Sequence, residues 1–81
     1  MAKLKILVFG GLKAYFPPEQ QLEVEEKMTI AEIIAQLPDL SSEAIKLIDK
    51  CALAVDGKLV QKDSCIGKAA ELAILPPFSG G

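Results

Sequence analysis

The sequence contains no histidine, no arginine and no tryptophan, and these absences exclude several kinds of active site. Without histidine, a catalytic triad of the ordinary kind and an imidazole metal ligand are both excluded. All nine cationic residues are lysines, so the forked guanidinium that makes two-point contacts with phosphate or base edges is absent. The run Gly10-Gly11-Leu12-Lys13 is too short to be a phosphate-binding loop. The chain therefore lacks the usual parts of a self-contained enzyme.

Strong charge of either sign is also absent, because the nine cations face 11 acidic residues for a net charge of −2. Such a balance does not supply the excess of positive charge with which proteins bind nucleic acid. The apolar run between Lys5 and Gly10 is too short for a signal sequence or a membrane span. We expect a cytoplasmic protein that has neither nucleic acid nor a membrane as a partner.

Cysteine is scarce, and the spacing of Cys51 and Cys65 fits neither a metal site nor a Cys-x-x-Cys redox pair. A free cysteine commonly packs as a small buried hydrophobe, which is the role that we expect for both. A disulfide between them stays open as an alternative. The sequence thus predicts no bound metal and no bound cofactor.

Apolar residues are plentiful, at 51% of the 81 positions, which excludes intrinsic disorder. The chain is too short for two cores, so we expect one domain over residues 1–81. Apolar periodicity and the turn signal Asp56-Gly57 predict strands at 3–9, 21–25 and 71–75, and a hairpin within 53–60. The segments 12–20 and 61–70 are expected to be irregular.

Two helices are predicted in the middle of the chain. Thr29-Ile30-Ala31-Glu32 is a capping box, and Pro38 ends the helix that it begins. Ser41 and Ser42 offer N-caps for a second, shorter helix. The first and last strands are apolar on both faces, so we expect them to lie side by side, parallel, at the centre of the sheet. With one main helix packed on one face of a mixed sheet, the predicted fold is α+β, of the β-grasp (ubiquitin-like) type.

The ending Pro76-Pro77-Phe78-Ser79-Gly80-Gly81 is the one segment with a clear chemical use. Proline cannot continue a strand, so residues 76–81 are expected to protrude as a tail. Glycine is slim enough for the terminal carboxylate to enter a narrow active site on another protein. There a nucleotide-dependent enzyme can form an acyl-adenylate, and sulfur can displace AMP to leave a thiocarboxylate. A frayed terminus without a function is the alternative.

This ending resembles the Pro-Pro-x-Ser/Thr-Gly-Gly terminus of the small subunits of molybdopterin synthase, the MoaD family. The strand Glu71–Leu75, the opening Lys5–Gly10 and the segment Ala54–Val60 also resemble their counterparts. The likeness spans the whole chain, although only the ending is specific. One departure is Ala69-Ala70-Glu71, where members of the family often have Gly-Asp-Glu.

The resemblance implies a sulfur carrier with no activity of its own. Gly81, preceded by Gly80, would be adenylylated by an activating enzyme that uses ATP and then converted to a thiocarboxylate. The carrier would dock on the large subunit of molybdopterin synthase and donate sulfur to cyclic pyranopterin monophosphate. The product would serve a molybdenum or tungsten cofactor, and the carrier itself would bind no metal.

Strand alternation predicts a docking surface on the sheet face opposite the main helix, and the family resemblance agrees with it. Leu4, Ile6 and Val8 should face the helix, so that Leu7 and Phe9 point away from it. The predicted partner contacts are Leu7, Phe9, Leu59, Leu75, Pro76, Pro77, Phe78 and Ser79. A two-sided core filled by these apolar side chains is the alternative.

Three other functions stay open. A thiamine-type sulfur carrier has the same tail chemistry with a different acceptor, although such carriers usually lack the Pro-Pro pair. A ubiquitin-like modifier would be joined through Gly81 to lysines of other proteins. A plain interaction module with an idle tail would leave Gly80-Gly81 unexplained.

Overall fold

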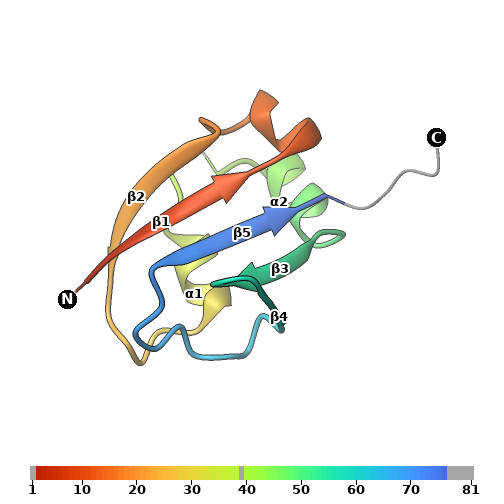
Figure 1. The fold of residues 1–81 in the computed structure, drawn as a ribbon. Coiled ribbons are helices and arrows are strands. Elements are labelled where there is room, and N and C mark those ends of the chain that lie inside the picture. The colour runs from red at the N-terminus through yellow and green to blue at the C-terminus, as the bar shows by residue number, and fades with distance from the viewer. Residues whose placement is uncertain (1, 39, 77–81) are drawn as a thin grey trace.

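The computed structural model describes residues 2–38 and 40–76. Within them a mixed sheet has the strand order β2-β1-β5-β3-β4, and both helices lie on one face of it (Figure 1). The elements are β1 (Ala2–Val8), η1 (Gly10–Ala14), β2 (Glu19–Val24), α1 (Ile30–Ala35), α2 (Ser42–Ile48), β3 (Ala52–Val55), β4 (Lys58–Val60) and β5 (Glu71–Leu75). The predicted β-grasp plan is confirmed.

The centre of the sheet is the parallel pair β1 and β5, as the apolar pattern predicts. Their register runs from Lys5 opposite Glu71 to Val8 opposite Ile74. β2 pairs antiparallel with β1 at one edge, and β3 pairs antiparallel with β5 on the other side. Because β5 has a partner strand on each side, the chain leaves the sheet from its middle.

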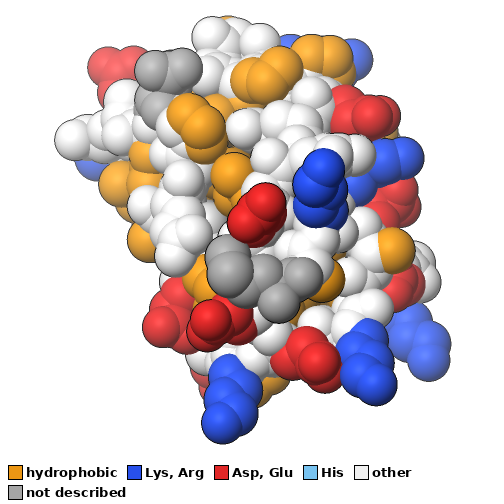
Figure 2. All heavy atoms as spheres, turned by 90° about the vertical axis from the view of Figure 1, so that its left-hand side faces the viewer, with side chains coloured by type: hydrophobic (Ala, Val, Ile, Leu, Met, Phe, Trp, Pro, Cys, Tyr) orange, Lys and Arg blue, Asp and Glu red, His pale blue; other side chains and the backbone are white. Residues whose placement is uncertain are grey.

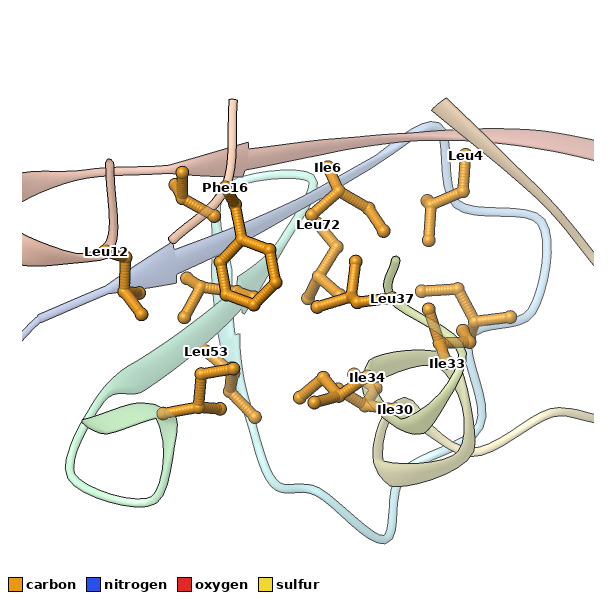
Figure 3. Close-up of a cluster of buried hydrophobic side chains, with 14 of the residues drawn as sticks. Leu4, Ile6, Leu12, Phe16, Ile30, Ile33, Ile34, Leu37, Leu53 and Leu72 are labelled. Atoms are coloured by element: carbon orange, nitrogen blue, oxygen red, sulfur yellow. The ribbon is translucent and has the colours of Figure 1, made fainter. Parts of the chain in front are cut away.

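The core lies between the sheet and the helices, where alternate side chains of the two central strands meet α1 (Figure 3). Leu4, Ile6 and Leu72 are fully buried there. From the helix side the core receives Ile30, Ile33 and Ile34. Each such side chain contributes about 1.5–3 kcal/mol by leaving water, so this layer is the main source of stability.

Both helices begin as the sequence predicts. The Thr29 hydroxyl accepts from the Glu32 N–H at 3.2 Å, and a Glu32 carboxylate oxygen accepts from the Thr29 N–H at 2.9 Å. These contacts with Thr29 lower the pKa of Glu32. The contribution of this carboxylate to stability is therefore present above its unfolded-state pKa, and it is lost as the pH falls through the lowered one. The Ser41 hydroxyl caps α2 in the same way, accepting from the Ala44 N–H at 3.1 Å.

The Asp56-Gly57 hairpin is confirmed, with φ of 47° and 86° at its two central residues. Asp56 also has a role that the sequence did not predict. Its carboxylate accepts from the N–H of Ala70 at 3.2 Å and from that of Glu71 at 3.0 Å. The turn is thus attached to the start of β5.

The prediction of an irregular segment over 12–20 is wrong in part. Gly10 begins the 3-10 helix η1, and β2 starts at Glu19 rather than at residue 21. The physical reason is apolar burial, because Leu12 and Phe16 both enter the core. They hold the segment against the sheet in a defined conformation.

Candidate functional site

The C-terminal tail is the predicted chemical site, and the structure describes only its first residue, Pro76, which we call the root of the tail. Gly81 and Gly80, together with Pro77, Phe78 and Ser79, lie outside the described residues. The root itself is well placed, because β5 ends at Leu75 and half-buried Pro76 follows directly. A tail that starts from the central strand of the sheet is attached to the most tightly held part of the fold.

The outer face of the sheet, opposite the helices, carries the predicted docking residues. Leu7 of β1 and Leu75 of β5 alternate with core-facing neighbours and so share this face. Leu59 of β4 lies on it as well, because it is paired with Ala54, whose neighbours in β3 pack against the core. Phe9 follows β1, with 40% of its surface exposed, and Leu59 is 75% exposed. Leu7 and Leu75 are half-buried and lie outside the buried core cluster.

These exposures decide against a two-sided core in the described part of the chain. A core would cover Phe9 and Leu59, whereas both are among the exposed large hydrophobic residues. The predicted placement on the outer face is therefore confirmed for Leu7, Leu59 and Leu75. Their role in binding stays a prediction.

The register adds three alanines that the sequence analysis missed. Leu7, Ala73, Ala54 and Leu59 are opposite one another in turn, forming one row across four strands. Ala52, opposite Leu75, belongs to the same face. Phe9 has the extended backbone of a strand, with φ of −134° and ψ of 162°, so it continues the alternation of β1 on the side of Leu7. We call these six residues, together with Phe9, the outer apolar face. Small side chains lie at its middle and large ones at its rims, and only the strand register could have revealed this.

Charged residues lie on the same side of the sheet but farther from the tail. Lys3 is opposite Glu23, and Lys5 lies beside Glu71. Figure 2 shows the end of the molecule that carries β2, where lysine and acidic side chains are interspersed rather than sorted by sign. The sheet surface is thus polar at the start of β1 and apolar where β5 gives way to the tail.

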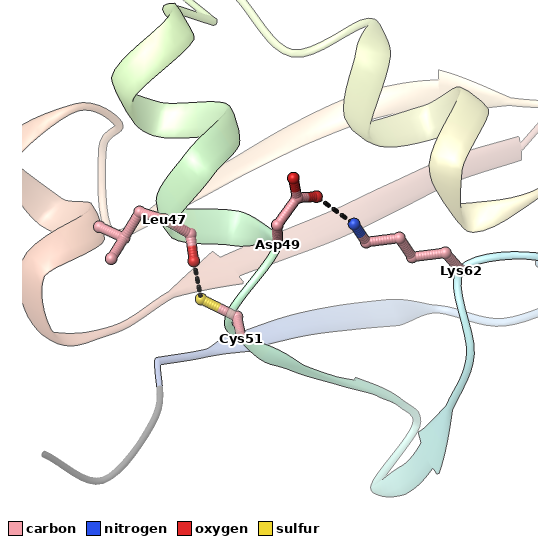
Figure 4. Close-up of polar contacts among 4 residues, drawn as sticks. All are labelled: Leu47, Asp49, Cys51 and Lys62. Carbon is pink, nitrogen blue, oxygen red and sulfur yellow. Dashed lines mark hydrogen bonds and ion pairs between the residues drawn. The ribbon is translucent and has the colours of Figure 1, made fainter.

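The two cysteines are free thiols and differ in their surroundings. Cys51 is half-buried, and its Sγ donates to the Leu47 carbonyl oxygen at 3.1 Å (Figure 4). Burial raises the pKa of the Cys51 thiol, while the charge of Lys62, which forms an ion pair with Asp49, acts in the opposite direction. A raised pKa leaves less thiolate at neutral pH, so Cys51 is a poor nucleophile. Cys65 is exposed, which corrects the expectation that both would be buried.

No group of three or more Cys, Asp or Glu side chains at residues 2–38 and 40–76 is arranged to hold a metal ion. In the same part of the chain, no helix is long and apolar enough to cross a membrane.

Three solved structures share this fold at low sequence identity. SAMP1 from Haloferax volcanii aligns with a TM-score of 0.74 and 18% identity, covering 99% of this chain and 100% of that one. A putative molybdopterin converting factor, subunit 1, from Pyrococcus furiosus aligns with a TM-score of 0.76 and 17% identity, covering 95% and 99%. The third is in a complex of subunits 1 and 2 of molybdopterin-converting factor from Helicobacter pylori, with a TM-score of 0.69, 18% identity and coverage of 99% and 100%.

Comparison with curated protein sequences gives no significant match. The sequence model of the ThiS family, in contrast, matches residues 6–81. That range takes in nearly the whole sheet, both helices and the Gly-Gly ending. The chain therefore belongs to the ThiS family.

Proposed function

We propose that this chain is the sulfur-carrier subunit of a molybdopterin synthase, working through its C-terminal glycine. The observation that carries the proposal is the ending Pro76-Pro77-Phe78-Ser79-Gly80-Gly81 on a ThiS-family domain. The solved structures support it, because two of the similar chains are subunit 1 of a molybdopterin converting factor. The outer apolar face is suited to a large-subunit partner, because it leaves Phe9 and Leu59 exposed beside half-buried Leu75, from which the tail continues.

The first step activates the terminal carboxylate on a separate adenylylating enzyme. The Gly81 carboxylate oxygen attacks the α-phosphate of ATP, an acyl-adenylate forms, and pyrophosphate leaves. A sulfur donor at the oxidation level of sulfide then attacks the acyl carbon. The carbon–sulfur bond forms while the bond to AMP breaks, and AMP leaves with the electron pair. No net oxidation occurs, and Gly81 ends with one sulfur in place of one oxygen.

The second step delivers the sulfur on the large subunit. The thiocarboxylate sulfur attacks an electrophilic carbon of cyclic pyranopterin monophosphate and displaces an oxygen group. Water then cleaves the acyl–sulfur bond, which leaves sulfur on the pterin and restores the Gly81 carboxylate. The domain contributes no acid, base or metal to either step. Its part is to carry the tail and to bind the adenylylating enzyme and the large subunit in turn. We place the carrier and these two partners in the cytoplasm.

A modifier function is the second candidate, because a further structure with this fold, at a TM-score of 0.73 and 17% identity, is that of H. volcanii small archaeal modifier protein 1. In that case the acyl-adenylate or thiocarboxylate would react with a lysine amine on another protein. A thiamine-type carrier is the third candidate, since it shares the ThiS family domain. The three functions differ only in the acceptor, so the acceptor must be the variable in the test.

We expect two equivalents of thiocarboxylated protein to convert one equivalent of cyclic pyranopterin monophosphate to the dithiolene product when the large subunit is present. The matched reactions replace the pterin and the large subunit with the sulfur-free precursor of the thiamine thiazole and its synthase, or with lysine-containing proteins and the activating enzyme. Mass spectrometry should detect sulfur-containing pterin in the first reaction, and neither thiazole nor lysine conjugates in the other two. Formation of thiazole or of lysine conjugates instead, with no pterin product, would transfer the assignment to the corresponding candidate.

A further inference from the structure

The root of the tail lies against the turn that follows β1. β1 and β5 are parallel, and their last recorded pair is Val8 opposite Ile74. Two residues farther along each strand are Gly10 and Pro76. Gly10 turns the chain into η1, whereas Pro76 has no N–H with which to extend the sheet. Both strands therefore stop at the same level, and the two residues meet.

Gly10 accepts the proline ring because it has no side chain. A Cβ on Gly10 would lie 2.7 Å from the Cγ of Pro76, well inside van der Waals contact, and 3.6 Å from its Cβ. Gly10 also has a φ of 60°, a left-handed conformation that favours glycine. The pyrrolidine ring fixes its own φ near −65°, so a ring held in place also fixes the bond from which the tail continues.

We propose that Gly10 is a positioning residue for the C-terminal tail, because the Pro76 ring packs directly against its backbone. We call this contact surface on Gly10 the seat of Pro76. The seat sets the direction in which the chain leaves β5 on its way to a partner's active site. This inference rests on the proposed function, since direction matters only if the terminus is delivered somewhere. Small misplacements of a reacting group are costly, at about a hundredfold in rate for 1 Å in sensitive cases.

Gly67 provides a matched control within the same chain. Its φ is 62°, nearly that of Gly10, yet a Cβ built on it would meet no atom within 4 Å. Alanine at either position therefore introduces the same left-handed strain, but only at Gly10 does it strike Pro76. We expect Gly10→Ala and Gly67→Ala to share a strain-derived loss in the thermal unfolding midpoint of about 4–8 °C.

The test measures single-turnover sulfur transfer by thiocarboxylated variants bound to the large subunit at saturating concentration. Gly10→Ala should slow the transfer about tenfold or more, whereas Gly67→Ala should leave it unchanged. The affinity of both variants for the large subunit should match that of the unmodified sequence. A loss of rate without a loss of affinity indicates a misdirected tail rather than a damaged domain.

A double-mutant cycle with Pro76→Ala tests the contact itself. This change removes the Cγ that the new methyl group would strike and leaves only the Cβ at ordinary contact distance. On the Pro76→Ala background, Gly10→Ala should therefore cause no further loss of transfer. If Gly10→Ala alone does not fold, the double variant should fold and transfer like Pro76→Ala alone.

Two results would overturn the inference while leaving the proposed function intact. One is equal transfer by Gly10→Ala and Gly67→Ala. The other is a double variant whose loss of transfer rate equals the sum of the two single losses, or a double variant that fails to fold. Absence of transfer by the unmodified sequence would instead remove the proposed function, and the inference with it.

Discussion

Deletion of Gly81 is expected to reduce sulfur transfer to the level measured without any carrier, while thermal unfolding stays unchanged. Addition of one residue after Gly81 should have the same effect. Either change moves the terminal carboxyl by about 3.5 Å along the chain, far beyond the tolerance of a positioned reaction. Stability should not change, because the buried core residues lie at positions 4–74.

Addition of one glycine before Met1 is the matched control for the extension. β1 begins at the opposite end of the molecule from the place where β5 leaves the sheet (Figure 1). This variant should transfer sulfur at the normal rate. Persistent transfer by the Gly81 deletion, measured as pterin that carries one sulfur after a single turnover, would contradict the sulfur-carrier account.

Replacement of Phe9 or Leu75 by aspartate is expected to weaken binding to the large subunit by about 2 kcal/mol or more, roughly thirtyfold in Kd. A carboxylate placed in an apolar contact must lose its hydration without gaining a partner. Both residues belong to the outer apolar face, and Leu75 directly precedes the tail. Isothermal titration calorimetry with the large subunit would give the affinities.

Ile45→Asp is the matched control for Phe9→Asp. Ile45 is 43% exposed and Phe9 is 40% exposed, but Ile45 lies on α2, in the helix layer. The control should bind the large subunit like the unmodified sequence. Equal losses for Ile45 and Phe9 would indicate a general effect of added charge, and unfolding of the Phe9 variant would place that residue in the core instead.

The features that the sequence predicted well are those encoded by neighbouring residues. The capping box at Thr29 and Glu32 requires only a spacing of three, and the Asp56-Gly57 hairpin requires only two residues that tolerate positive φ. The last strand, Glu71–Leu75, was predicted with its exact bounds because Pro76 marks its end. Local chemistry determines these elements, so a single sequence is enough.

The apolar pattern also predicted that β1 and β5 lie side by side, but the residue-level contacts between distant parts of the chain could not be predicted. The apolar row from Leu7 to Leu59 depends on the register of four strands, and the seat of Pro76 on Gly10 depends on where two of them stop. The attachment of Asp56 to the start of β5 joins residues 14 and 15 positions apart. Sequence periodicity identifies the faces of a strand but does not state which residue lies opposite which.

The location of the transferred sulfur tests the central claim most directly. The protein would be incubated with its activating enzyme, ATP and sulfide, and its intact mass and C-terminal peptide would then be measured. The account predicts one sulfur in place of one oxygen, located on Gly81 and lost when the large subunit and cyclic pyranopterin monophosphate are added. A Gly81 that gains no sulfur under these conditions would contradict it.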